Sequence, residues 1–115
     1  MQAELYSELA IRTANPNADQ LTNALLGIAG ESGEICDYMK KVLFHDKVLD
    51  RQVVIAELGD LAWYMNQLMH VFDTSWEEVF DKNIKKLSAR YPDLVFDAGR
   101  ANNRDTAAEM EAMKG

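Results

Sequence analysis

The chain has 115 residues, of which 48% are apolar, and this length suits a single domain with a modest core. Nineteen acidic against 12 basic residues give a net charge of −7, which argues against a nucleic-acid polymer or an anionic membrane as partner. A single cysteine excludes an internal disulfide. With no signal-like N-terminus and no apolar run of about 20 residues, the composition predicts a soluble cytoplasmic protein.

Helical spacing of apolar residues runs through almost the whole chain. A first short helix is expected over residues 3–13, and Pro16 lies in the turn that follows it. A second helix is expected over about 20–44, with Asp19 or Thr22 as its N-cap. Its inward-facing apolar residues are expected to be Leu21, Leu25, Ile28, Ile35, Met39 and Val42.

An acid pair interrupts this apolar series. Glu31 lies three residues after Ile28 and four before Ile35, so it stands where an apolar side chain is expected. Glu34 follows at i+3, on the same side of the helix. A charged side chain in an apolar stripe costs free energy unless a counter-charge or a cation compensates it, so this pair is expected to have such a partner.

Three glycines flank this acid pair, at Gly27, Gly30 and Gly33. Each lowers helix propensity by about 1 kcal/mol relative to alanine. Three of them in one helix predict the close approach of a neighbouring helix or of a ligand.

The third expected helix, over about 50–72, repeats the acidic pattern. Glu57 lies three residues after Val54 and four before Leu61, so it too takes the place of an apolar residue, and Asp60 follows at i+3. The inward-facing apolar residues of this helix are expected to be Val54, Leu58, Leu61, Met65 and Leu68.

A fourth helix is expected to begin after an N-cap at Thr74 or Ser75 and to end at about Arg90. No segment reads as a strand. The pattern predicts an all-α, four-helix-bundle-like domain over residues 1–98. The tail over 99–115 is expected to be a short helix or a flexible arm.

Two helices with such acid pairs can meet face to face, and four carboxylates then converge without a counter-charge. Mg²⁺, or Mn²⁺ in its place, suits all-oxygen ligands and phosphates. A di-iron bundle would need a histidine three residues after a glutamate, and neither His45 nor His70 meets this requirement. The pattern alone leaves open a plain solvated acidic face.

Three short runs carry a resemblance to a known family. They are GESGEI over 30–35 followed by Asp37 and two lysines, ELGDLAWY over 57–64, and NIKKLSARYP over 83–92. In this order, across roughly residues 20–96, they resemble the three motifs of MazG-type nucleotide pyrophosphohydrolases.

The resemblance implies an all-α, Mg²⁺-dependent hydrolase that cleaves a nucleoside triphosphate to the monophosphate and pyrophosphate. It also implies a role in nucleotide-pool housecleaning and assembly into homodimers or homotetramers. The implied metal ligands and catalytic residues are Glu31, Glu34, Glu57 and Asp60. The implied substrate contacts are Asn83, Lys86, Arg90 and Tyr91.

Two further substrate contacts are expected from position. Trp63 lies three residues after Asp60 and can stack a base, although an aromatic side chain in a bundle more often belongs to the core. Lys41 can add positive charge near the phosphates, with a solvated surface lysine as the alternative.

Alternatives within the same superfamily are dUTP/dCTP-type and phosphoribosyl-ATP pyrophosphohydrolases, and a non-catalytic nucleotide-binding helical module is a third. The sequence has no P-loop and no arrangement of Ser, Cys or His typical of a nucleophile. A metal-activated water is therefore favoured over a covalent intermediate. Base preference is not encoded in the motifs.

Overall fold

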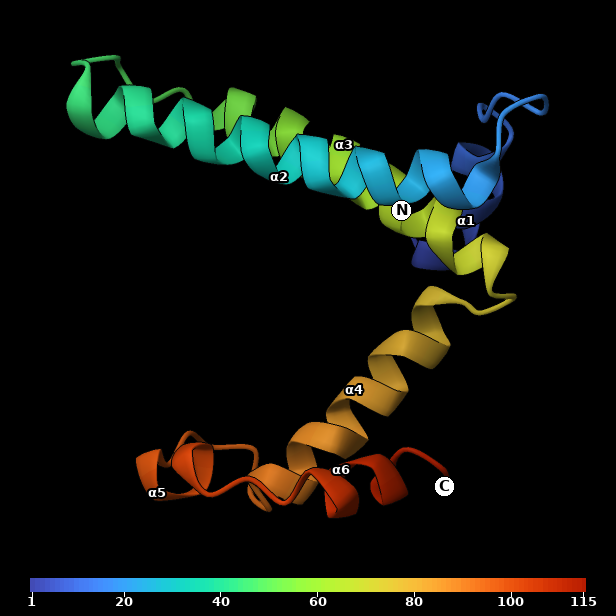
Figure 1. The fold of residues 1–115 in the computed structure, drawn as a ribbon, viewed down its shortest axis with the longest axis vertical. Helices are drawn as coiled ribbons and strands as arrows, with labels where there is room; N and C mark the ends of the chain where they lie inside the picture. The colour runs from blue at the N-terminus through green and yellow to red at the C-terminus, as the bar shows by residue number, and fades with distance from the viewer. The chain divides into compact units, whose positions relative to one another are not determined.

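A computed structural model describes residues 1–115 and consists of helices without a strand, which confirms the all-α prediction (Figure 1). The chain divides into two compact units, residues 1–75 and 76–115. The helices are α1 (Ala3–Ile11), α2 (Gln20–Phe44), α3 (Arg51–Val71), α4 (Trp76–Arg90), α5 (Ala98–Asn102) and α6 (Thr106–Ala112).

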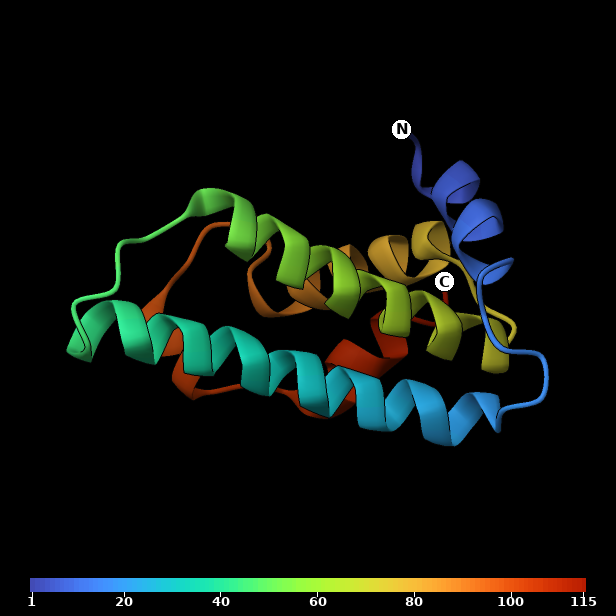
Figure 2. The ribbon, with the colours of Figure 1, turned by 90° about the horizontal axis from the view of Figure 1, so that it is seen from above.

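The first unit is built on a hairpin of α2 and α3, which lie side by side in Figures 1 and 2. The bounds of α2 are those predicted, and Asp19 is its N-cap, with a side chain that accepts a hydrogen bond from Thr22 N at 3.1 Å. Asp50 caps α3 in the same way, accepting from Gln52 N at 2.9 Å. These caps satisfy backbone N–H groups that have no partner inside the helix.

Polar side chains join α2 to α3 at both ends of the hairpin. Near the loop, the buried Tyr38 hydroxyl accepts a hydrogen bond from Asp50 N at 2.7 Å and donates to Asp50 O at 3.4 Å. At the far end, the buried Gln67 amide donates to Gln20 Oε1 at 2.7 Å and accepts from Asn23 Nδ2 at 2.9 Å. Both buried polar groups are therefore satisfied.

Between these ends the two helices approach closely at one glycine. A Cβ atom on Gly27 would overlap the ring of Tyr64, which packs against the α2 backbone there. Gly30 and Gly33 have open space at the same position. The predicted close approach is thus confirmed at Gly27, where the neighbour is α3, and it does not occur at the other two glycines.

Helix α1 is attached to α3 by hydrogen bonds. The Trp63 indole N–H donates to Ala10 O at 3.2 Å and to Thr13 Oγ1 at 2.8 Å. Asn66, which is buried, donates to Ser7 O at 3.2 Å. The end of α1 is therefore held beside the middle of α3.

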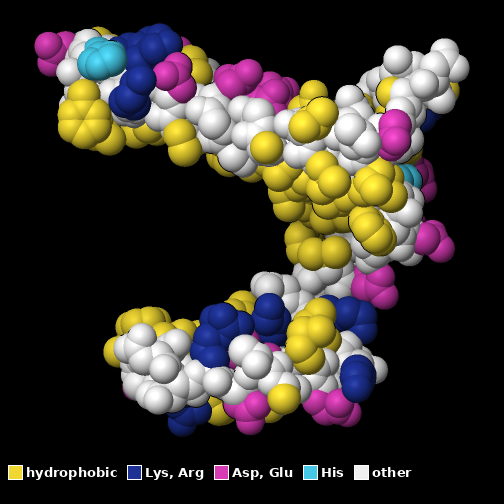
Figure 3. Space-filling model, viewed as in Figure 1, with side chains coloured by type: hydrophobic (Ala, Val, Ile, Leu, Met, Phe, Trp, Pro, Cys, Tyr) yellow, Lys and Arg dark blue, Asp and Glu magenta, His cyan; other side chains and the backbone are white.

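The buried apolar core of the single chain is small. It consists of Ala10, Ala24, Tyr38 and Met69. Several residues that were expected to face inward are instead exposed, namely Leu21, Leu25, Leu58 and Met65. That expectation was wrong because two paired helices cover only one stripe of each other. Figure 3 shows apolar side chains open on the visible surface of the first unit. None of the helices has the length and apolar character needed to cross a membrane.

The second unit packs α6 against α4 through a buried ion cluster. Glu109 is 1% exposed, and its Oε1 accepts from Arg90 Nη2 at 2.7 Å and from Arg90 Nε at 3.2 Å. Arg104 donates to the same carboxylate through Nη2 and Nε, both at 3.0 Å. The hydrogen bonds from Arg104 and Arg90 lower the pKa of Glu109 to about 2.

Candidate metal and nucleotide site

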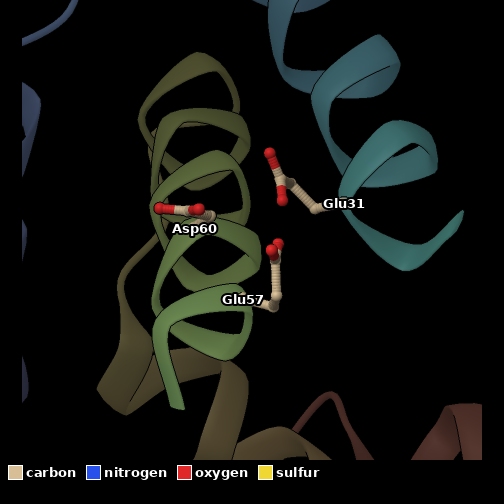
Figure 4. Close-up of side chains that lie close together, drawn as sticks. All are labelled: Glu31, Glu57 and Asp60. Carbon is tan, nitrogen blue, oxygen red and sulfur yellow. The ribbon is translucent and has the colours of Figure 1, made fainter. Parts of the chain in front are cut away.

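The α2–α3 hairpin brings three of the four predicted acids together. Glu31 from α2 and Glu57 and Asp60 from α3 each offer a carboxylate oxygen, and these oxygens all lie within 4.8 Å of one another. Figure 4 shows Glu31 reaching from α2 across to α3. The i,i+3 spacing on α3 places its two acids on one side of that helix. Glu31 and Glu57 are half-buried, and Asp60 is exposed.

The cluster has negative charge without a counter-charge, since no salt bridge reaches these three residues. The pKa of Glu31 is raised to about 7, first by a hydrogen bond with the Glu57 side chain and then by burial. The nearby charges of Glu34 and Asp60 raise it further. Carboxylates that repel each other in this way hold a proton at neutral pH unless a cation replaces it.

Two oxygen atoms of the cluster have no partner. Oε2 of Glu31 and Oε2 of Glu57 are buried and accept no hydrogen bond. A buried acceptor left unsatisfied costs free energy, so these atoms are where a ligand would be stabilising. The candidate metal ligands are all carboxylate oxygens, and neither histidine belongs to the cluster. His45 is exposed at the end of α2, and His70 forms a hydrogen bond with Ser7 Oγ at 2.9 Å. This set of carboxylate oxygens fits a hard divalent cation such as Mg²⁺ or Mn²⁺.

Glu34 lies outside the group of three. It is exposed on α2, about one turn beyond Glu31. Its negative charge interacts electrostatically with Glu31 and helps to raise the pKa of that residue. Its role as a fourth metal ligand stays a prediction.

A cavity of about 410 Å³ opens beside the acids. Its lining residues are Thr13, Glu31, Asp60, Trp63 and Tyr64. The rings of Trp63 and Tyr64 meet edge to face at 5.1 Å, so the cavity has carboxylates and aromatic rings in its wall. Thr13 was not singled out in the sequence. No local pattern points to it, because its contact with Trp63 joins residues 50 positions apart.

The three clustered acids, together with Trp63 and Tyr64 of the cavity wall, lie on a segment that matches a known family. The family model of the MazG nucleotide pyrophosphohydrolase domain matches residues 19–95. The chain belongs to the MazG nucleotide pyrophosphohydrolase family. It is also 35% identical over 101 residues to the "Gene 37 protein" of Mycobacterium phage L5, a match that covers 78% of this chain and 89% of the phage protein. No solved structure matches the chain.

Lys41 lies on the MazG domain close to the end of α2. It forms a salt bridge with Asp37 at 2.9 Å, and Lys40 reaches the same carboxylate at 3.5 Å. The hydrogen bond from Lys41 lowers the pKa of Asp37. Because its ammonium group is engaged locally, the substrate contact expected of Lys41 stays a prediction.

The remaining candidates of the MazG domain belong to the second unit. Asn83, Lys86 and Arg90 follow one another at spacings of three and four on α4, so they lie along one side of that helix. The side chains of Asn83 and Lys86 form no hydrogen bond or salt bridge. Arg90 is held by Glu109, and its guanidinium carbon lies 5.7 Å from the centre of the Tyr91 ring. Of these residues, Asn83 and Lys86 therefore have side chains without a polar partner, whereas the guanidinium of Arg90 is paired with Glu109.

Proposed function

We propose that this MazG protein hydrolyses nucleoside triphosphates, (d)NTP and water giving (d)NMP and pyrophosphate, with Mg²⁺ as cofactor. The supporting observation is the pair of buried, unpartnered Oε2 atoms on Glu31 and Glu57, beside a cavity of about 410 Å³. Asp60 completes the ligand group, and Glu34 is proposed as a further ligand. Mn²⁺ is expected to substitute for Mg²⁺.

The chain's own residues have separate tasks in this proposal. Bound Mg²⁺ supplies charge neutralisation on the phosphates and lowers the pKa of a water molecule. Glu31, with a pKa of about 7, releases its proton readily near neutral pH and so becomes available as a ligand. A carboxylate oxygen of the cluster that is not a ligand accepts the proton of the attacking water. Trp63 offers its ring to the base from the cavity wall.

The phosphates need positive and hydrogen-bonding groups as well. Asn83 and Lys86 are proposed for this contact because both are free of partners on α4. The amide of Asn83 can donate to a phosphate oxygen, and the ammonium group of Lys86 offsets its charge. Arg90, Tyr91 and Lys41 are proposed as further substrate contacts.

Self-association is part of the same proposal. Many large apolar side chains are exposed in the single chain, and Phe44 reaches 76% exposure. Such a surface is unusual for a stable monomer. We expect homodimers or homotetramers, in which a second copy completes the four-helix-bundle-like core. A role in cleansing the nucleotide pool agrees with the net charge of −7, which disfavours binding to nucleic-acid polymers.

One experiment tests the activity. The purified protein is incubated with a panel of NTPs, dNTPs and phosphoribosyl-ATP plus Mg²⁺, and the products are separated by chromatography. Monophosphate and pyrophosphate are expected, and the Glu57→Gln variant should form neither. Glu8→Gln removes an exposed acid of α1 and serves as the control that keeps activity.

The pattern of products separates the alternatives. Turnover restricted to dUTP and dCTP, or to phosphoribosyl-ATP, would assign the protein to one of those branches. Diphosphate and phosphate as products would indicate a different hydrolase. Nucleotide binding without turnover of any compound in the panel would contradict the proposed enzyme and favour a binding module.

A further inference from the structure

The segment before the MazG domain contributes one residue to the wall of the cavity beside the acids, and this residue is Thr13. We propose that Thr13 is a positioning residue for the base: its hydroxyl oxygen holds the indole of Trp63 in the orientation on which a nucleobase stacks. This role rests on the proposed function, since it takes Trp63 as the base contact. All the residues involved belong to the first unit, over residues 1–75.

The end of α1 orients the hydroxyl of Thr13. Ala10 O is one of the last four carbonyl groups of α1, which have no partner further along the helix. It accepts a hydrogen bond from Thr13 N at 3.0 Å and another from Thr13 Oγ1 at 2.7 Å. Because a carbonyl oxygen only accepts, the hydroxyl hydrogen of Thr13 is directed at Ala10 O. The lone pairs of Thr13 Oγ1 are therefore left for other donors.

The indole of Trp63 uses one of these lone pairs. Its Nε1–H donates to Thr13 Oγ1 at 2.8 Å and to Ala10 O at 3.2 Å, so the bond to Thr13 is the shorter one. Ala10 O already accepts two hydrogen bonds from Thr13, which match its two lone pairs. Thr13 is thus the main acceptor of the indole. Rotation of an aromatic ring about its Cβ–Cγ bond has broad minima, so this hydrogen bond selects one orientation.

The ring held in this way lines the cavity of about 410 Å³ together with the acids Glu31 and Asp60. The ring of Tyr64 meets it edge to face, with an angle of 83° between the two planes. Trp63 is half-buried, so part of its surface stays accessible. A planar base gains stacking energy from a ring of fixed orientation, whereas a triphosphate chain gains none. Thr13 therefore acts on the base and leaves the phosphates unaffected.

The test separates the base from the phosphates. The full-length protein is titrated with Mg²⁺ and the α,β-imido analogues of the four common dNTPs, which resist cleavage between the α- and β-phosphates, and with inorganic triphosphate, which has no base. Thr13→Val removes the hydroxyl that accepts from Trp63. The dissociation constants of the analogues are expected to rise about threefold to fivefold, and that of inorganic triphosphate should not change. KM for a hydrolysed nucleotide should rise by the same factor, with kcat changed less than about twofold.

A spectroscopic measurement reports on the ring itself. The chain has two tryptophans, so Trp76→Phe leaves Trp63 as the only one. In that background, Thr13→Val should lower the fluorescence anisotropy of the ligand-free protein, because the indole gains freedom to turn. Thr13→Ser keeps the hydroxyl oxygen and should retain the wild-type anisotropy and dissociation constants. In a Trp63→Phe background, which lacks the indole N–H, Thr13→Val should cause no further rise in the dissociation constants.

Two controls distinguish positioning from a general loss of stability. Thr22→Val makes the same substitution at an exposed residue of α2 whose hydroxyl forms no hydrogen bond, and it should match wild type. Ser7→Ala removes a different attachment of α1 to α3, the hydrogen bond between Ser7 Oγ and His70 Nε2 at 2.9 Å. Because it leaves the contacts of Trp63 in place, the dissociation constants should stay at the wild-type values.

The role of Thr13 is overturned if Thr13→Val leaves the dissociation constants of all four analogues unchanged, or raises that of inorganic triphosphate equally. It is also overturned if Thr13→Ser behaves like Thr13→Val, or if Ser7→Ala has an equal effect. Wild-type protein that binds the analogues but hydrolyses no nucleotide contradicts the proposed function alone, because the dissociation constants still decide the role of Thr13. Wild-type protein that binds no analogue and hydrolyses no nucleotide contradicts both.

Discussion

The two units each enclose a glutamate, and the two carboxyl groups behave in opposite ways. In the first unit Glu31 faces other acids, and its pKa rises to about 7. In the second unit the nearly inaccessible Glu109 faces two arginines, and its pKa falls to about 2. Hydrogen bonding to the neighbouring side chains is the largest cause in both cases, and burial raises the pKa of both groups.

The difference separates a binding site from a structural attachment. All the charge of Glu109 is compensated by Arg90 and Arg104, so nothing remains for a ligand to satisfy. In contrast, Glu31 and Glu57 keep buried oxygens without partners. A cluster of acids indicates a cation when its own fold leaves it unsatisfied, and only the first unit meets that condition.

The largest expected effect comes from neutralising the unsatisfied cluster. Glu31→Gln keeps the size of the side chain but removes one of the carboxylates expected to bind the cation. We expect kcat/KM for triphosphate hydrolysis to fall by about a thousandfold, and Mg²⁺ to stop raising the melting temperature. Glu4→Gln, on the exposed side of α1, is the control and should match wild type. Full activity in Glu31→Gln would remove the distinction between the two clusters.

The second prediction concerns the pH dependence of stability in metal-free protein. The folded-state pKa of Glu31, about 7, exceeds its usual 4.5, so its contribution is present below pH 4.5 and is lost as pH rises through 7. The folded-state pKa of Glu109, about 2, lies below 4.5, so its contribution is present above pH 4.5 and is lost as pH falls towards 2.

Urea denaturation in EDTA across pH 2–8 measures both effects. Glu31→Gln should flatten the change between about pH 4.5 and 7, and Glu109→Gln should flatten the change between about pH 2 and 4.5. If either variant altered the opposite part of the profile, the two glutamates would not carry the charges assigned to them here.

The third prediction tests the close contact that brings the acids of the hairpin together. Gly27→Ala places a methyl group in the Tyr64 ring, so it should destabilise the protein by about 1–3 kcal/mol and weaken Mg²⁺ binding. Gly33→Ala has free space and should stabilise the same helix by up to about 1 kcal/mol. Chemical denaturation and calorimetric titration with Mg²⁺ measure the two effects. Equal results for the two variants would mean that α2 does not approach α3 at Gly27.

The smallest expected effect concerns the wall of the cavity. Trp63→Phe keeps an aromatic ring but removes the N–H that donates to Ala10 O and Thr13 Oγ1. A loss of about 1 kcal/mol in the free energy of unfolding is expected, with a modest rise in KM. Thermal denaturation and steady-state kinetics measure both quantities, and Trp76→Phe, in the second unit, controls for the loss of a tryptophan elsewhere.

Local patterns were enough to predict the part of the site that lies on the hairpin. The bounds of α2, its cap at Asp19 and the shared face of Glu57 and Asp60 all follow from spacings of a few residues. Helical periodicity determines such positions before any tertiary contact is known. The convergence of Glu31 with the α3 acids could be expected because both interrupt apolar series.

Contacts between distant positions could not be predicted in the same way. Arg90 and Glu109 lie 19 residues apart, and no periodic pattern joins α4 to α6. The exposure of Leu25 and Leu58 was missed because apolar spacing shows which residues prefer burial and does not show what covers them. The division into a domain over 1–98 and a tail over 99–115 stays a prediction.

The polar attachments at the two ends of the hairpin have a consequence for its register. A slip of one helical turn between α2 and α3 would shift the facing acids by about 5.4 Å, more than the 4.8 Å within which their ligand oxygens lie. The bonds of Tyr38 to Asp50 at one end and of Gln67 to Gln20 at the other oppose such a slip. Side chains outside the acid cluster thus keep carboxylates of two separate helices within reach of one another.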